Sequence, residues 1–96
     1  MGERVARGEN LRCYVEVKNF AKVLTNAVDI DLVISDPAGL IVETKHFIDI
    51  THESLGVYYY SYRPSSTAVL GTYCALWDVT LAGEHRKRRD YFIVTE

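Results

Sequence analysis

Two histidines and two carboxylates lie close together in the middle of the chain, and these are residue types that bind metals. Imidazole nitrogen and carboxylate oxygen suit zinc or another divalent ion. On an extended strand, however, the first two of these side chains would face opposite sides, and the polar loop that follows is short. The pattern therefore favours a solvated strand end and loop, and we expect neither a metal nor another cofactor here. The four residues are His46, Asp49, His52 and Glu53.

Hydroxyl and thiol side chains could act as nucleophiles, which need a base within hydrogen-bond reach and an oxyanion donor. Ser65, Ser66 and Thr67 lie in a predicted connecting loop with no glycine elbow, and Cys74 lies within a predicted strand without a histidine nearby in sequence. A glycine loop that could hold a phosphate is also absent from the sequence. We therefore expect no catalytic residue and a protein that is not an enzyme.

A basic run, His85–Arg89, contains four of the eleven positively charged residues of the chain. Such a run could follow a phosphate backbone or contact an acidic protein surface. It could equally be a solvated hairpin whose charges discourage aggregation between strands. Stacking of nucleic-acid bases would also need exposed aromatic rings beside the cations, and only Tyr91 is well placed. The candidate contact residues are Arg86, Lys87, Arg88 and Arg89.

Four further residues are interface candidates because they are apolar and alternation places them on outward faces: Val57, Tyr59, Cys74 and Leu76. Exposed apolar patches often mark interfaces, and tyrosine makes such contacts at a low cost in conformational entropy. The alternative is that they are ordinary exposed residues, since single apolar side chains on a surface are common.

The elements that must position these residues are strands. Apolar residues alternate with polar ones in short runs separated by turn residues, which is typical of strands half buried on a core. The predicted inward residues include Val28, Ile30 and Leu32, then Tyr58, Tyr60 and Tyr62, and then Tyr73, Ala75, Trp77 and Val79. His46–Ile50 should continue or kink a strand, and Thr51–Leu55 should be a loop. The prediction is an all-β, immunoglobulin-like antiparallel β-sandwich of about seven strands.

Length and composition limit the function classes. Residues 1–96 are enough for one domain, and 48% hydrophobic with 25% charged residues is typical of an ordinary globular protein. The net charge of -2 gives no global reason to expect binding to nucleic acid or to a membrane surface. The segment 1–10 contains four charged residues and no apolar run, so it does not resemble a secretory signal. Met1 followed by Gly2 favours an intact short gene product.

The two cysteines test the immunoglobulin interpretation, because antibody domains join two strands with one buried disulfide. Alternation places Cys13 inward with Leu11 and Val15, but it places Cys74 outward, between the inward residues Tyr73 and Ala75. We therefore expect both thiols to be reduced, which favours an intracellular or intravirion location over a secreted one.

Three sequence features occur together: Asp36-Pro37-Ala38-Gly39 after a strand, Gly56-Val57-Tyr58-Tyr59-Tyr60, and Gly71-Thr72-Tyr73 before a closing Phe92-Ile93-Val94. In this order they resemble the macroglobulin-type immunoglobulin-like domain, in the short stand-alone form seen among uncharacterised proteins of tailed phages and prophages. The resemblance implies a β-sandwich associated with virions. It transfers no thioester chemistry, which lies in a different domain of that family.

The function we expect is therefore a non-catalytic structural or assembly protein of a tailed phage or related virus, located in the virion after assembly in the host cytoplasm. It would act in capsid decoration, a head-tail connector or a tail through contacts with other virion or structural proteins, or as a homo-oligomer. The alternative is a surface or secreted binding module, of the macroglobulin or adhesin type, from a longer chain. A third hypothesis, nucleic-acid binding through Arg86–Arg89, predicts a steep dependence on salt. We expect no membrane partner.

Overall fold

The computed structural model describes residues 3–96, which form eight strands and one short 3-10 turn. The strands are β1 (Glu3–Ala6), β2 (Leu11–Glu16), β3 (Asp29–Ser35), β4 (Ile41–Lys45), β5 (Thr51–Ser54), β6 (Val57–Tyr62), β7 (Gly71–Leu81) and β8 (Glu84–Thr95), with the turn η1 at Phe47–Asp49.

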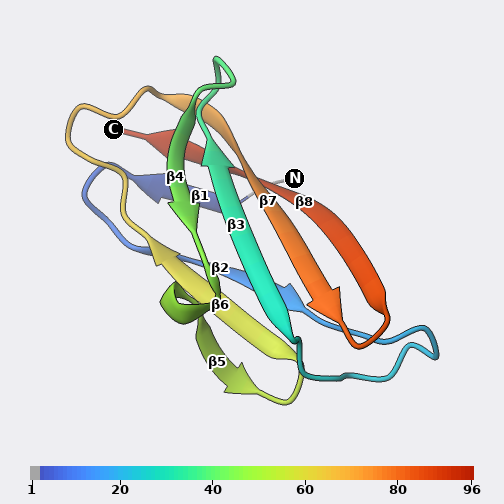
Figure 1. Cartoon of the computed structure of the whole chain (residues 1–96). Helices are drawn as coiled ribbons and strands as arrows, with labels where there is room; N and C mark the ends of the chain where they lie inside the picture. The colour runs from blue at the N-terminus through green and yellow to red at the C-terminus, as the bar shows by residue number, and fades with distance from the viewer. Residues whose placement is uncertain (1–2) are drawn as a thin grey trace.

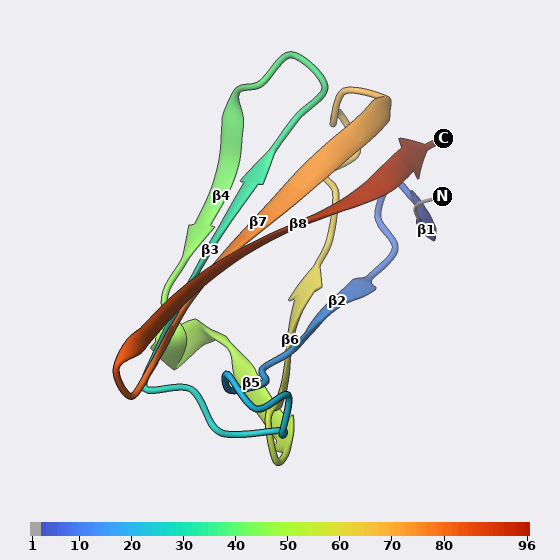
Figure 2. The same ribbon diagram turned by 90° about the vertical axis from the view of Figure 1, so that its right-hand side faces the viewer.

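Two sheets pack face to face (Figures 1 and 2). The large sheet has five strands in the order β1-β8-β7-β3-β4, and the small sheet has three in the order β2-β6-β5. All neighbouring strands are antiparallel except β1 and β8, which are parallel and pair only from Glu3 opposite Phe92 to Ala6 opposite Thr95. The all-β class predicted from alternation is therefore confirmed.

The core lies between the sheets and is made of the residues that alternation places on the two inner faces. Trp77 is completely buried at its centre. The buried apolar side chains are Val5, Leu11, Val15, Val17, Ile30, Leu32, Ile34, Ile50, Tyr58, Tyr62, Tyr73, Ala75, Trp77, Val79, Leu81, Phe92 and Val94.

The predicted inward faces are confirmed with three differences, the first of which is Cys13, which packs against the core but is only half-buried. Tyr60 is only half-buried, and its hydroxyl donates a hydrogen bond of 2.7 Å to the Glu43 carboxylate. Val28 was predicted to be inward, but it lies one residue before the start of β3 and 61% of it is exposed.

The predicted loop Thr51–Leu55 is wrong, because most of it is the edge strand β5. Every residue of β5 is exposed, so no apolar alternation marks it, and the strand exists through backbone pairing with β6. Immediately before it, η1 kinks the chain between the two sheets, one of the two outcomes predicted for His46–Ile50.

The turn at Asp36–Gly39 forms as its composition predicts. Oδ1 of Asp36 accepts hydrogen bonds of 2.9 Å from the backbone amides of Ala38 and Leu40. Gly39 has a φ of +86°, which L side chains rarely adopt. The turn joins β3 to β4.

Candidate functional site

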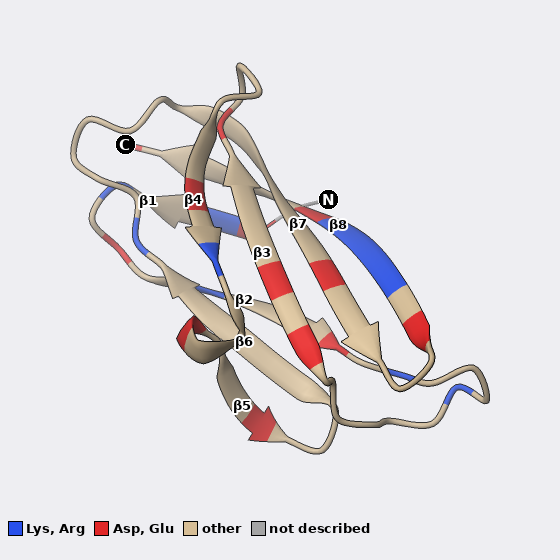
Figure 3. Ribbon diagram, in the orientation of Figure 1, with Lys and Arg blue, Asp and Glu red and all other residues tan. Residues whose placement is uncertain are grey.

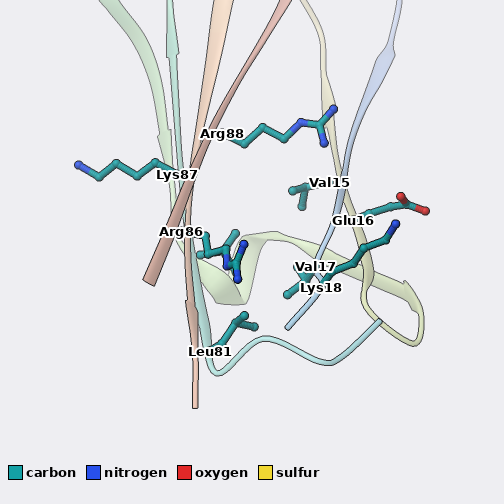
Figure 4. Close-up of a pocket in the computed structure, with 9 residues that line it drawn as sticks. Val15, Glu16, Val17, Lys18, Leu81, Arg86, Lys87 and Arg88 are labelled. Atoms are coloured by element: carbon teal, nitrogen blue, oxygen red, sulfur yellow. The ribbon is translucent and has the colours of Figure 1, made fainter. Parts of the chain in front are cut away.

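The basic run lies on the first half of β8, immediately after the β7–β8 hairpin (Figure 3). Because successive side chains of a strand point to opposite faces, the run is divided between two surfaces. Figure 4 shows Arg86 and Arg88 directed toward β2, with Lys87 on the other side of β8. Lys87 lies opposite Asp78, and Arg89 lies opposite Leu76, on the outer face of the large sheet.

A groove separates β2 from this half of β8, with a volume of about 450 Å³. Its floor is apolar, because Val15 of β2 and Val17, directly after β2, point toward β8 (Figure 4) and line the groove together with Val79 and Leu81 of β7. We call this surface the open side. Its remaining lining residues are Glu16, Lys18, Arg86, Lys87 and Arg88.

The β8 strand has a free edge along the open side. β1 pairs with Phe92–Thr95, and its first residue, Glu3, lies opposite Phe92. Among residues 3–96, no strand pairs with Glu84–Arg89 on the side away from β7. Alternate residues of this stretch therefore direct their backbone N–H and C=O groups away from the sheet, where another strand could pair with them.

Ion pairs neutralise the groove-facing row of β8. Arg86 Nη2 lies 2.7 Å from Glu84 Oε1, and Arg88 Nε lies 3.2 Å from Asp90 Oδ1. The hydrogen bond from Arg86 lowers the pKa of Glu84. The outer row of β8 is made of His85, Lys87 and Arg89. His85 contacts Asp78 of β7, and the residues that the structure describes provide no ion-pair partner for Lys87 or Arg89. The unpaired positive charge is therefore on the outer row.

The apolar interface candidates do not form one patch. Val57 and Tyr59 lie on β6, on the outer face of the small sheet. There the Arg12 guanidinium lies 4.6 Å from the centroid of the Tyr59 ring, and Tyr14 packs against the same ring at 5.3 Å. Sequence reasoning did not select Arg12 and Tyr14, although alternation along β2 places both outward.

Cys74 and Leu76 lie on β7, on the outer face of the large sheet and so on the opposite side of the molecule. Leu76 is opposite Val33, and Cys74 is opposite Tyr91, which is 54% exposed. All four predicted candidates are half-buried. The structure therefore divides them into two separate pairs, one on each outer face.

The four side chains of metal-binding types, His46, Asp49, His52 and Glu53, make other contacts, and Glu53 accepts a hydrogen bond of 3.4 Å from the Tyr14 hydroxyl. His46 Nδ1 lies 2.7 Å from Asp31 Oδ1, and this hydrogen bond raises the pKa of His46. Asp49 accepts a hydrogen bond from the His46 backbone amide, and His52 stacks on Tyr58 with ring centroids 4.4 Å apart. Within residues 3–96, no three His, Cys, Asp or Glu side chains form a group that could hold a metal ion.

The two thiols lie as alternation predicts. Cys13 packs against the core from β2, and burial raises its pKa to about 12. Cys74 is on the outer face of β7, and both cysteines are free. Of the hydroxyl nucleophiles, Ser65 and Thr67 contact each other, with 3.4 Å between their oxygens.

Comparison with known proteins gives similarity in three dimensions only. No family model matches the chain, and a search of curated proteins finds no match. Among solved structures, the filamin domain of Lin-41 superimposes with a TM-score of 0.65 at 21% identity, covering 97% of this chain and 83% of that one. The domain has an immunoglobulin-like β-sandwich fold.

Two other solved structures support this fold. An engineered protein matches with a TM-score of 0.72 at 17% identity, and an endo-beta-1,4-mannanase from Thermotoga petrophila matches with 0.65 at 14%. Each match covers 99% of this chain but only 18% of the other, so this chain spans less than a fifth of the length of those two proteins. Within residues 3–96, no helix has the length and apolar character needed to cross a membrane.

Proposed function

We propose that this immunoglobulin-like domain is a non-catalytic module that binds a partner protein across its open side. The observation that supports the proposal is the coincidence, at one place, of an apolar-floored groove and a free strand edge. A free edge attracts unrelated strands unless it is protected or used, and β-strand addition is a common mode of peptide recognition. Such contacts require no reacting group.

A peptide selection tests this function. A library of random peptides is selected on the immobilised domain, and each binder is mapped by NMR chemical shifts of the backbone amides. We expect binders to shift the amides of Val15–Lys18 and Glu84–Arg89. An Arg88→Ala variant should bind the selected peptides more weakly. Lys22→Ala, which also removes a basic side chain but from an exposed loop residue, should leave their affinity unchanged. Binders that shift only the outer faces or the loop ends would contradict the proposal.

The setting we propose for this module is the particle of a tailed phage or related virus, and the sequence resemblance described above supports it. Mass spectrometry of purified particles tests the setting, and absence of the chain from intact virions would refute it. The alternative is a module of a longer surface or secreted protein. What supports the 'longer protein' part of this alternative is that two matched solved structures are longer chains, of which the match covers only 18%. A coding frame that continues past Glu96 into a surface protein would decide for it.

A further inference from the structure

We infer that the open side takes an extended segment in which acidic and apolar residues alternate, added as a strand to the free edge of β8. The inference rests on the proposed function and specifies its partner. A strand beside Glu84–Arg89 would present one row of side chains to the groove and the other to the outer face of the large sheet. The chemistry of each row of β8 then defines the side chains that fit next to it.

The groove-facing row favours apolar partners. Its two arginines are already neutralised, at 2.7 Å by Glu84 and at 3.2 Å by Asp90. Beside them lies the apolar floor that includes Val15 and Val17. An added carboxylate on this side would compete with existing ion pairs and lose water, whereas an aliphatic side chain would extend the apolar contact. Valine, isoleucine or leucine therefore fits this row.

The outer row favours acidic partners. It contains His85, Lys87 and Arg89, and the described residues provide no ion-pair partner for the last two. Cross-strand pairs of opposite charge stabilise a sheet, and like charges directly opposite destabilise it. Glutamate or aspartate at alternate positions of the added strand would lie next to these cations. The alternating pattern thus follows from the two faces of one strand.

A second copy of this chain does not fit the same edge. In a symmetric antiparallel pairing centred on Lys87, this residue would face its own copy, and His85 would face Arg89 of the other molecule. Shifting the centre to Arg88 would place Lys87 opposite Arg89. The charges that exclude a second copy therefore also select an acidic partner.

Two synthetic peptides of identical composition test the pattern. In one, valine and glutamate alternate; in the other, the same residues form an apolar block and an acidic block. We expect the alternating peptide to bind at least about tenfold more tightly, by fluorescence anisotropy, because only it places the glutamates on one face. Equal affinity for both peptides would overturn the alternating pattern.

Two double variants test the charges and the edge. The Lys87→Glu, Arg89→Glu double variant should bind the alternating peptide with an affinity lower by about tenfold or more, because two attractions to its glutamates become repulsions. The Arg4→Glu, Lys22→Glu double variant makes the same change in net charge at exposed residues whose side chains form no hydrogen bond or ion pair within residues 3–96, and it should leave affinity nearly unchanged. Hydrogen exchange should slow at alternate amides of Glu84–Arg89 when the peptide is bound. Exchange unchanged there would overturn strand addition.

The outcomes separate this inference from the proposed function. If selected peptides bind the open side without an acidic and apolar alternation, the partner chemistry inferred here is wrong and the binding function stands. If no peptide binds the open side, both are wrong. If a single-stranded oligonucleotide binds there and loses affinity in the Lys87→Glu, Arg89→Glu variant while peptides do not bind, the partner is a nucleic acid and both proposals fail.

Discussion

Replacing Gly56 by alanine should destabilise the domain strongly. Gly56 is buried and has a φ of +70°, so an alanine would adopt a left-handed conformation that costs about 1–2 kcal/mol. Its Cβ would also lie 2.8 Å from the carbonyl oxygen of Val17 and 3.0 Å from the amide nitrogen of Thr25. These atoms are backbone, so the chain itself would have to move.

The movement would strain two hydrogen bonds that connect the small sheet to the loop after β2. The Val17 amide donates to the Gly56 carbonyl at 2.7 Å, and the Thr25 amide donates to the Val17 carbonyl at 3.0 Å. Each is worth about 1 kcal/mol. The strained hydrogen bonds and the left-handed conformation together cost about 3.5 kcal/mol. Alanine also makes the unfolded chain stiffer, which offsets about 0.5 kcal/mol, so the free energy of unfolding should fall by about 3 kcal/mol. Because Val17 is part of the groove floor, Gly56 also fixes the position of part of the open side.

Gly83→Ala is the matched control. Gly83 has a similar φ of +76°, but an added Cβ would meet no atom within 4 Å. The Gly83→Ala variant should therefore have a free energy of unfolding that is lower only by the cost of the left-handed conformation, about 1 kcal/mol. In urea denaturation monitored by Trp77 fluorescence, the two variants should differ by about 2 kcal/mol, and their Tm values by roughly 8–16 °C. Equal losses, within about 0.5 kcal/mol, would refute the packing argument.

Three other predictions test the turn, a thiol and an exposed ion pair. Asp36→Ala removes an acceptor of two backbone hydrogen bonds and should lower the free energy of unfolding by about 1–2 kcal/mol in the same denaturation assay, with Asp36→Asn losing less. In a Cys74→Ser variant at pH 8, iodoacetamide should label Cys13 about a thousandfold more slowly in the folded than in the urea-unfolded chain, because burial raises its pKa to about 12 from an ordinary 9.0; labelling within tenfold would contradict this. Asp31→Asn should lower the pKa of His46 in an NMR titration. Since Asp31 raises that pKa, the pair's contribution to stability is complete below the ordinary histidine pKa and is lost as pH rises through the folded one; an unchanged pKa would show that the pair does not form.

Alternation predicts those parts of this fold that are buried on one face. It gives the inward sets of β2, β6 and β7, and it places Cys13 inward and Cys74 outward. It does not give β5, because Thr51–Ser54 is exposed on both faces and its side chains carry no signal of the pairing with β6. Val28 shows the opposite error, since the alternating pattern starts one residue before the strand does and this residue is exposed.

The candidate site is less predictable, because its parts come from distant positions. The basic run is visible in the sequence, but its importance depends on how far β1 extends along β8, which is a pairing between residues almost ninety positions apart. The groove depends on where β2 lies relative to β8, a relation between two sheets that no local pattern encodes. Only the division of Arg86 and Lys87 between two faces could have been derived from alternation alone.

The parallel pairing of β1 with β8 has a mechanical consequence. Glu3 lies opposite Phe92 and Ala6 opposite Thr95, so the two strands run in the same direction from opposite ends of the chain. Pulling the domain by its two ends would slide these strands along each other, and their evenly spaced hydrogen bonds would resist together instead of opening one by one. Under such a force the four-residue β1 would carry the load first and would separate from β8 first.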